Sequence, residues 1–153
     1  MKKIFMALLI VCALFFVPIS NVSALENTIT YIEEEFDDGS YIEVTIDYGN
    51  LNARSTTTRS KTATYKGVDG TIYWSVTVKG TFSYNGKTSS CTSSSVSTKN
   101  YSTTWKLSNA KASKSGATAI ASVTAKQYHQ DGELYRTINK TVKLTCDENG
   151  KLS

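Results

Sequence analysis

The chain holds a single histidine, His129, and its neighbours decide whether it can take part in catalysis. His129 lies in the stretch YHQDGE, two residues before Asp131, and serines are frequent along the chain. A histidine that a carboxylate orients can act as a general base toward a serine hydroxyl. A histidine beside a turn pair such as Asp131-Gly132, however, is more commonly a solvated loop residue. We therefore expect no catalytic residue and no enzymatic activity.

Metal and cofactor sites are also not indicated by the residue types and their spacing. A zinc site needs several cysteine or histidine ligands, which one histidine and a pair of cysteines do not supply. The acidic stretch EEEFDDGS, residues 33–40, offers carboxylates that suit calcium, but it lacks the ligand spacing of an EF-hand loop. We interpret it as a solvated hairpin, and we expect no metal and no cofactor.

Residues 1–24 have the composition of a secretory signal peptide. Lys2 and Lys3 precede the apolar run IFMALLIVCALFFVPI, and small residues then lead to a cleavage site after Ala24. The apolar run is shorter than the ~20 residues that a membrane-spanning helix needs, so an anchor is the weaker alternative. We therefore expect a secreted, extracellular protein of a bacterium.

The three cysteines differ in their expected fate. Cys12 lies in the leader and follows Val11, where a lipoprotein signal has a small residue, so we expect it to be removed with the leader. Cys91 and Cys146 remain, and the exterior of the cell is oxidising. We expect a disulfide between them, which closes a loop of about 55 residues and stabilises the fold by roughly 4 kcal/mol. Two free thiols are the alternative.

Alternation of apolar and polar residues recurs along the mature chain and predicts β-strands. It is clear in YIEVTIDY, TIYWSVTVKG, YSTTWKLSN and RTINKTVKLTC. The stretch ATAIASVTAKQY is rich in helix-favouring alanine, but its interleaved serine and threonine fit a strand better. The tract SSCTSSSVST fits an exposed strand face, with a disordered linker as the alternative. The residues that we expect to be buried are Trp74, Trp105, Val76, Val78, Leu107, Ile138, Val142 and Leu144.

Turn signals divide the chain into hairpins. Pairs that supply the positive φ angles of tight turns are Asp38-Gly39, Asp69-Gly70, Asn85-Gly86, Asp131-Gly132 and Asn149-Gly150. The stretch GNLNARSTTTRS, residues 49–60, has no periodicity and is interpreted as a linker. We expect an acidic N-terminal β-hairpin in residues 25–48. Residues 61–153 then form an all-β domain, either an immunoglobulin-like β-sandwich or a small antiparallel barrel.

Two resemblances support this fold. The spacing of Cys91, Trp105 and Cys146 resembles that of immunoglobulin domains, which implies a sandwich with a tryptophan packed on an inter-sheet disulfide. Leu144, however, stands where those domains have a tyrosine, two residues before the second cysteine. The runs KTATYKGVDGTIYWSVTVKGTFSYNG and ASKSGATAIASVTAK resemble a group of small secreted proteins of Firmicutes over residues 61–153. That resemblance implies export and supplies no catalytic residue.

The charge is unevenly divided between the hairpin and the rest of the chain. Residues 25–48 hold eight acidic residues and no basic ones, whereas residues 54–153 hold fifteen basic and five acidic residues. Surface ion pairs contribute only about 0–1 kcal/mol each, so we expect the apolar face of Ile42, Val44 and Ile46 to hold the hairpin on the body. The basic residues form no cluster, so we expect no nucleic-acid partner.

Exposed aromatic residues are the remaining functional signal. Tyr73 and Tyr135 fall on strand faces opposite the apolar rows, so we expect both to be exposed. Exposed aromatics on a sheet can stack on sugar rings or anchor a protein partner, which makes these two the candidate ligand contacts. The alternative is that tyrosine is used because it suits strands. We expect a non-enzymatic protein with a binding or interaction role at or outside the bacterial cell surface. Its partner would be a cell-envelope polymer, a glycan or a protein, and a bacteriocin-like antagonistic factor is the alternative function.

Overall fold

The structure is a computed structural model that describes residues 27–49 and 55–153. The predicted leader with its cleavage site and Cys12 lies outside the described residues, as do residues 50–54 of the predicted linker. The described ranges consist of strands, turns and their connections. No helix within these ranges is long and apolar enough to cross a membrane.

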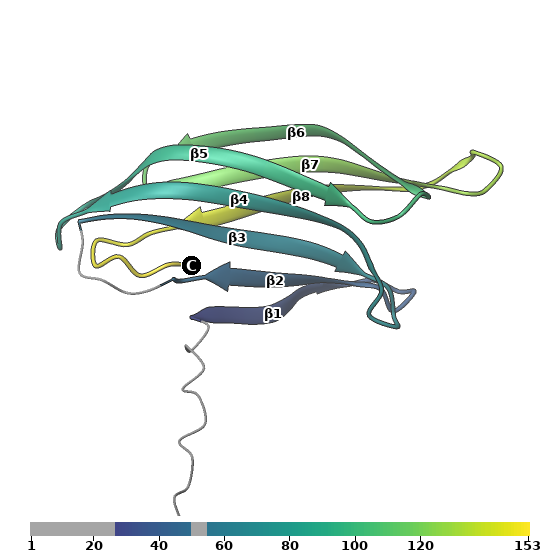
Figure 1. Cartoon of the computed structure of the whole chain (residues 1–153), viewed down its shortest axis with the longest axis horizontal. Coiled ribbons are helices and arrows are strands. Elements are labelled where there is room, and N and C mark those ends of the chain that lie inside the picture. Colours follow the sequence, from purple (N-terminus) through teal and green to yellow (C-terminus); the bar gives the residue numbers. More distant parts are fainter. Residues whose placement is uncertain (1–26, 50–54) are drawn as a thin grey trace, which may run out of the picture.

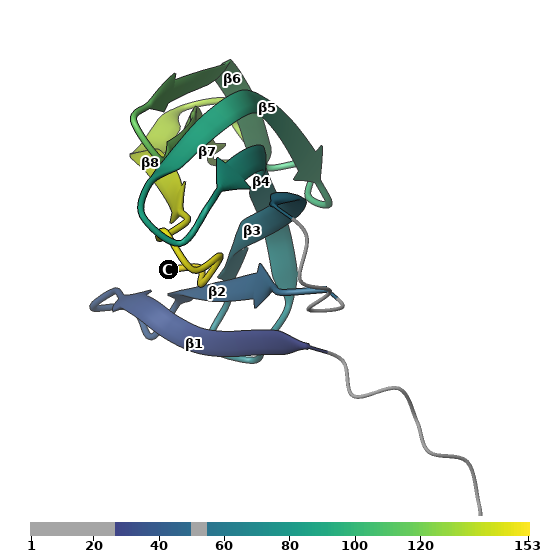
Figure 2. The ribbon, with the colours of Figure 1, turned by 90° about the vertical axis from the view of Figure 1, so that its left-hand side faces the viewer.

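Eight antiparallel strands follow one another along the chain. They are β1 (Thr28–Glu35), β2 (Tyr41–Asp47), β3 (Thr56–Lys66), β4 (Ile72–Tyr84), β5 (Ser89–Asn100), β6 (Trp105–Ser115), β7 (Thr118–Tyr128) and β8 (Leu134–Thr145). Strands β1 to β5 form one sheet and β6 to β8 form a second, both in sequential order. The sheets lie face to face (Figures 1 and 2), which confirms the all-β sandwich. Because the order is sequential rather than Greek-key, the resemblance to immunoglobulin domains holds for the layers alone.

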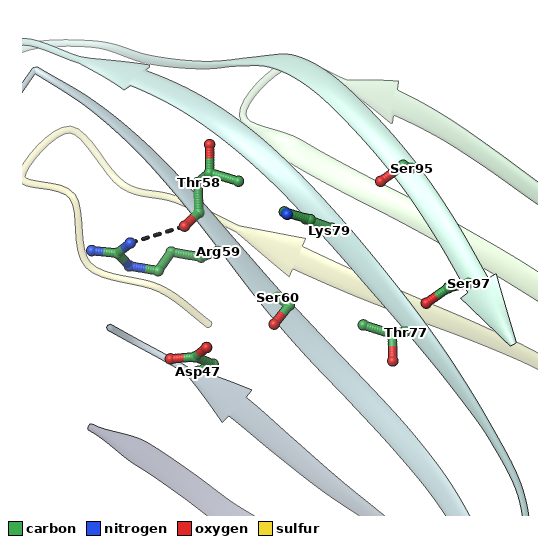
Figure 3. Close-up of a pocket in the computed structure, with 8 residues that line it drawn as sticks. All are labelled: Asp47, Thr58, Arg59, Ser60, Thr77, Lys79, Ser95 and Ser97. Atoms are coloured by element: carbon green, nitrogen blue, oxygen red, sulfur yellow. Dashed lines mark hydrogen bonds between the residues drawn. The ribbon is translucent and has the colours of Figure 1, made fainter. Parts of the chain in front are cut away.

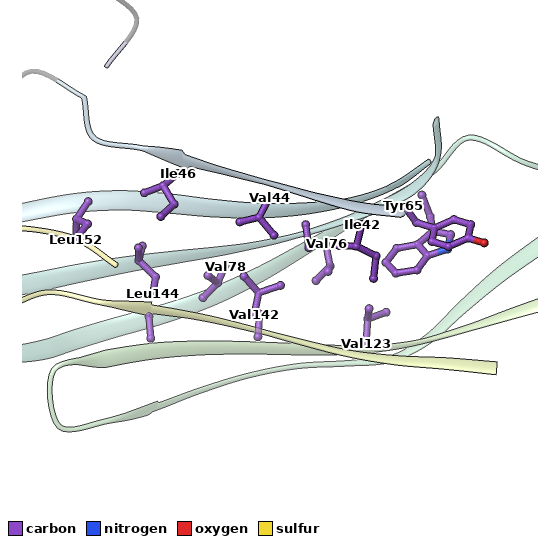
Figure 4. Close-up of a cluster of buried hydrophobic side chains, with 14 of the residues drawn as sticks. Ile42, Val44, Ile46, Tyr65, Val76, Val78, Val123, Val142, Leu144 and Leu152 are labelled. Carbon is purple, nitrogen blue, oxygen red and sulfur yellow. The ribbon is translucent and has the colours of Figure 1, made fainter. Parts of the chain in front are cut away.

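The predicted N-terminal hairpin, β1 and β2, is part of the larger sheet. β2 pairs with β3 along its whole length, from Asp47 opposite Ser60 to Tyr41 opposite Lys66. The apolar face of β2 is buried and points toward Val142 and Leu144 of the smaller sheet (Figure 4). The prediction that the hairpin docks through its apolar face is therefore confirmed, and one sheet runs through both the hairpin and the body.

The prediction of a linker over residues 49–60 is wrong at its C-terminal end, because β3 begins at Thr56. The strand pairs with β4 from this residue onward. Its positions on the inward side of the sheet here are Thr57 and Arg59, both polar, so the hydrophobic period that marks a strand is missing. Tertiary pairing with β4 determines the conformation of this segment, and the local pattern does not.

The core fills the space between the two sheets (Figure 4). Most of the residues predicted to be buried are buried, but Leu107 and Ile138 are half-buried and pack against the edge of the core. The alanine-rich stretch is strand β7, which resolves the ambiguity between helix and strand. Its inward residues are Ala119, Ala121, Val123 and Ala125.

The turn glycines adopt the positive φ angles that the pairs predict, for example +77° at Gly39 and +91° at Gly132. In the described ranges Asn109 is the one non-glycine residue with a positive φ angle. The aspartate and asparagine residues of the turn pairs therefore have negative φ angles. The N–H of Gly39 donates to the carbonyl oxygen of Phe36 over 2.8 Å. This combination is a type I turn closed by a left-handed glycine, a longer hairpin connection than a two-residue turn.

The strand predicted in YSTTWKLSN is wrong over residues 101–104, which form the connection between β5 and β6. The side chain of Asn100 accepts the N–H of Ser102 over 3.1 Å, and the hydroxyl of Ser102 accepts the N–H of Thr104 over 3.2 Å. Such local bonds compete with a strand ladder for the backbone donors. The apolar alternation continues through this stretch without forming a strand.

Candidate functional site

Four connections meet at one end of the sandwich, which we call the loop end. It is made by residues 36–40, 67–71, 101–104 and 129–133, and it lies on the right in Figure 1. Loops that a rigid sandwich positions are common binding sites. Most of the exposed large hydrophobic residues of the described ranges lie here, and the others are on β1. Those at the loop end are Val68, Ile72, Tyr101, Leu134 and Tyr135.

A buried aromatic cluster lies directly beneath the loop end. The ring of Tyr65 stacks on Trp74 with 5.4 Å between centroids and lies 4.9 Å from Trp105. Phe36 of the first turn meets Tyr65 edge-on at 5.6 Å. Aromatic pairs at these distances are worth about 0.5–1.5 kcal/mol each beyond their buried area. The loops therefore rest on a well-packed base.

Tyr73, predicted to be an exposed ligand contact, belongs to this cluster. It is half-buried, and its ring lies 6.0 Å from that of Tyr65 and 6.5 Å from that of Trp105. The register shifts beside it, so that Lys66 pairs with Ile72 and Tyr73 is the extra residue of a bulge. A bulge can re-aim the side chain of its extra residue, and here the ring of Tyr73 lies against the aromatic cluster. The prediction that Tyr73 is exposed is therefore wrong, and Ile72 is exposed instead.

Tyr135 is exposed, as predicted, with 52% of its surface accessible. Its ring meets His129 edge-on at 4.8 Å. The guanidinium of Arg136 lies 4.9 Å from the centroid of the same ring. Tyr135 thus presents an accessible aromatic surface in a fixed orientation, and the structure does not place it in contact with Tyr73.

A hollow of about 350 Å³ lies between the β5–β6 connection and the β7–β8 turn, and His129, whose ring meets that of Tyr135, is part of its lining. Its lining is Thr103, Thr104, Lys106, Tyr128, His129, Gln130 and Gly132. The N–H of Tyr128 donates to the carbonyl oxygen of Thr104 over 2.8 Å and joins the two walls. The ammonium of Lys106 lies 4.9 Å from the centroid of the Tyr128 ring. The hollow therefore combines aromatic rings with hydrogen-bonding groups.

Arg136 anchors the loop end from below. Its guanidinium pairs with Asp38 of the first turn and donates to the hydroxyl of Tyr65 over 2.9 Å. Tyr65 in turn donates to the hydroxyl of Ser40 over 2.7 Å. The hydrogen bonds from Arg136 and then Ser40 lower the pKa of Asp38 to about 2, while burial raises the pKa of Tyr65. Asp38 is therefore ionised at neutral pH.

A second hollow, of about 520 Å³, lies on the outer face of the larger sheet (Figure 3). It is lined by Asp47, Thr58, Arg59, Ser60, Thr77, Lys79, Ser95 and Ser97. Asp47, Ser60, Lys79 and Ser95 lie side by side across four strands. This groove offers hydroxyl groups and charges on a rigid sheet, but no aromatic ring lines it.

The predicted disulfide is not formed, because Cys91 and Cys146 are both free and buried. The thiol of Cys91 donates to the carbonyl oxygen of Ser93 over 3.1 Å. The fold nevertheless places both cysteines at the β6–β7 turn. The N–H of Cys91 donates to Gly116 and that of Cys146 to Ala117, over 2.8 and 3.1 Å.

The residues considered for catalysis or metal binding have structural contacts. Asp131 accepts the N–H of Glu133 over 3.0 Å within its own turn, and the ring of His129 packs on Tyr135. In the described ranges no group of three or more histidine, cysteine or acidic residues could hold a metal ion. The acidic stretch at residues 33–40 instead forms ion pairs with Arg136 and Lys140 of β8.

Sequence reasoning found Tyr135 but missed the hollow beside it. In a series of antiparallel hairpins, alternate connections lie at the same end of the sheet. The connection at residues 101–104 and the turn at residues 129–133 are two such alternate connections. Counting strands would have placed them together, but the false strand over residues 101–104 concealed the first of them.

No family model matches the chain, and no curated protein or solved structure matches it either. The function is therefore inferred from the geometry of the loop end.

Proposed function

We propose that this is an exported, non-enzymatic binding protein that recognises a saccharide of the bacterial cell envelope at its loop end. The observation that carries the proposal is the accessible ring of Tyr135 beside the hollow that contains Tyr128 and His129. Aromatic rings beside a few polar groups are the usual lining of a small-ligand site.

The chemistry of the hollow suits a sugar better than an apolar ligand. The ring of Tyr135 offers a flat apolar surface to the C–H groups of a pyranose. Gln130 and Thr103 supply an amide and a hydroxyl for the sugar hydroxyls. The volume, about 350 Å³, lies at the low end of the range of ligand sites, which fits one or two sugar units.

The loop end is the better candidate of the two hollows. The groove on the larger sheet provides hydrogen bonds, but these replace bonds to water and yield only about 0.5–1.5 kcal/mol each. Stacking on the ring of Tyr135 adds a contact that the groove does not offer, because no aromatic residue lines it. Affinity for an uncharged saccharide is therefore expected at the loop end.

A binding panel tests the proposal. The probes are soluble peptidoglycan fragments, chito-oligosaccharides and teichoic acid, each titrated calorimetrically into the purified protein. We expect a saccharide from this panel to bind, and Tyr135→Ala to weaken its binding by about tenfold or more, because stacking and burial are lost. Val68→Ala is the control, since Val68 is also an exposed apolar residue but does not line the hollow. Equal loss in both variants, or no binding by any probe, would refute the proposal.

Export is the second part of the proposal, and it rests on residues 1–24. The protein recovered from the medium of the producing cell should begin at Leu25. An intact leader on a cell-bound protein would contradict it.

A further inference from the structure

Among the described residues, strand β1 is an outer edge of the larger sheet, and all eight of its residues are exposed. Figure 2 shows it far from β6 and β7. Ile29 and Tyr31 lie opposite Ile46 and Val44 on the inward side of the sheet. The smaller sheet buries Val44 and Ile46 but leaves Ile29 52% and Tyr31 39% accessible. The core face of the sheet therefore extends past the sheet that covers it.

The other free edges carry features that discourage pairing with another strand. β6 carries three lysines and a register shift between Ser108 and Lys111, and β8 carries Arg136 together with two lysines. On β5, the carbonyl oxygen of Thr92 accepts a bond from Lys114 over 2.9 Å. Charged side chains and bulges are the usual protection of an edge.

The protection of β1 covers only one half of the strand. Glu33 and Glu34 follow a register shift, and both reach Lys140 of β8. The other half, Thr28–Ile32, has the sequence TITYI, which is uncharged and composed of strong strand formers. Such a segment on an edge is a site for adding another strand.

We propose that Thr28–Ile32 pairs antiparallel with the same segment of a second copy, about a two-fold axis at Thr30, to form a homodimer with one ten-stranded sheet. In this register Ile29 of one copy faces Tyr31 of the other, and Thr28 faces Ile32. The contact is isologous and closes on itself, so it yields dimers rather than filaments.

The segment is complementary to itself on both faces in this register. On the inward face it forms two pairs of isoleucine with tyrosine, and aromatic residues opposite β-branched ones stabilise a sheet. On the outward face Thr30 bonds Thr45 over 3.0 Å and belongs to a row of hydroxyl residues that crosses the sheet. The rest of the row is Thr45, Thr62, Thr77 and Ser97. The two-fold axis continues this row into the second copy.

Charge selects the antiparallel arrangement. The glutamates at residues 33–35 lie beyond the paired segment, so antiparallel pairing places those of the two copies at opposite ends of the contact. Parallel pairing would place like charges directly side by side, which is destabilising. Antiparallel pairing also points the two loop ends in opposite directions. A dimer could then link two polymer chains, a consequence that rests on the proposed function, whereas the dimer itself does not.

A charge-swap experiment tests the dimer with the full mature chain. Sedimentation velocity over a range of concentrations should show a monomer–dimer equilibrium for the natural protein. The variants Ile29→Glu/Tyr31→Glu and Ile29→Lys/Tyr31→Lys should each be monomeric, since like charges face each other. An equimolar mixture should restore the dimer, because each Glu then faces a Lys. Val68→Glu, an exposed apolar position on a loop, is the control that should leave dimerisation unchanged.

Restoration in the mixture excludes misfolding of the variants as the cause of their dissociation. Each variant should also unfold cooperatively near the temperature of the natural protein. A natural protein that stays monomeric at all concentrations, or a mixture that stays monomeric, would overturn the proposal.

Cross-linking tests the register. In Thr30→Cys two thiols would face each other on the axis, with Cβ atoms about 4.5–5.5 Å apart. The thiol oxidant diamide takes up the two hydrogen atoms as the sulfur–sulfur bond forms. Thr30→Cys should cross-link at least about tenfold faster than Glu35→Cys, on the same strand but outside the segment. Equal rates would contradict the register.

Discussion

Arg136 of β8 donates a hydrogen bond from Nη1 to the hydroxyl oxygen of Tyr65 in β3 over 2.9 Å, and so joins the two sheets beneath the loop end. The same guanidinium pairs with Asp38 of the first hairpin turn. Tyr65 is buried, so this bond satisfies a polar group that would otherwise be costly to remove from water. The contact makes the acidic hairpin part of the base on which the loops rest.

The pairing of Arg136 with Asp38 predicts a specific dependence of stability on pH. The pKa of Asp38 is about 2, below its usual value of 3.8, because Arg136 and then Ser40 hydrogen-bond its carboxylate. A carboxyl group whose pKa is lower in the folded protein stabilises it above the unfolded pKa, and the contribution is lost as pH falls toward the folded pKa. The relevant window therefore runs from about pH 4 down to about pH 2.

The measurement compares the free energy of unfolding of the natural protein with that of Asp38→Asn. The natural protein should be the more stable above about pH 5, by a constant difference, because the other carboxyl groups titrate in both proteins. The difference should shrink below about pH 4 and vanish near about pH 2. A difference that persists unchanged at pH 2 would show that the Asp38 carboxylate is not stabilised by these contacts.

Gly80 of β4 lies where the two sheets approach each other closely. A Cβ atom added there would lie 2.7 Å from the Cβ of Ala119 in β7 and 2.5 Å from Cζ of Phe82. Gly80→Ala should therefore destabilise the protein by about 1–3 kcal/mol, as overpacking does in a well-packed core. Lys79→Ala, at the exposed neighbouring position, should change stability by less than about 0.5 kcal/mol in the same urea titration. A neutral Gly80→Ala would mean that the sheets can separate at little cost.

Trp105 begins β6 and is 1% exposed within the aromatic cluster. Trp105→Ala should cost about 3–5 kcal/mol of folding stability, since it removes a large buried ring. Tyr101→Ala, four residues earlier and 57% exposed, is the control and should cost less than about 0.5 kcal/mol. Similar costs for the two substitutions, measured by chemical unfolding, would contradict the packing described for the loop end.

The two thiols should be protected in the folded protein. Burial raises the pKa of Cys91 and that of Cys146, so little of the reactive thiolate is present at neutral pH. Labelling of the reduced protein with a chromogenic disulfide reagent should be slow when it is folded and fast when it is unfolded. Ser90→Cys, the exposed neighbour of Cys91, supplies a matched control that should react at once. Rapid labelling of the native thiols would place them at the surface.

The strands were predictable where one face of the sheet is buried and the other is exposed to solvent, because apolar and polar residues then alternate along the strand. β2 and β4 illustrate this. The start of β3 was not predictable, since its inward positions Thr57 and Arg59 are polar. Residues 101–104 were wrongly predicted to be a strand. The alternating pattern continues there, but side chains accept the hydrogen bonds of the backbone N–H groups of Ser102 and Thr104.

The candidate site was predictable in part for similar reasons. Tyr135 is exposed as expected, although it too is the extra residue at a register shift. Tyr73 lies at a similar shift, but its ring packs against Tyr65 and Trp105, and neither bulge leaves a clear trace in a single sequence. The hollow itself requires two loops that are 25 residues or more apart, so it depends on the strand order of the whole sandwich.

The central claim is that the loop end binds a saccharide, and its location can be measured directly. The ¹⁵N-labelled mature protein is titrated with the saccharide that binds in the panel, and amide chemical shifts are followed. We expect the changes to concentrate at residues 101–106 and 128–136. Residues 58–60, 77–79 and 95–97, which line the groove on the larger sheet, should remain unchanged. Shifts confined to the groove, or none at saturating saccharide, would contradict the account.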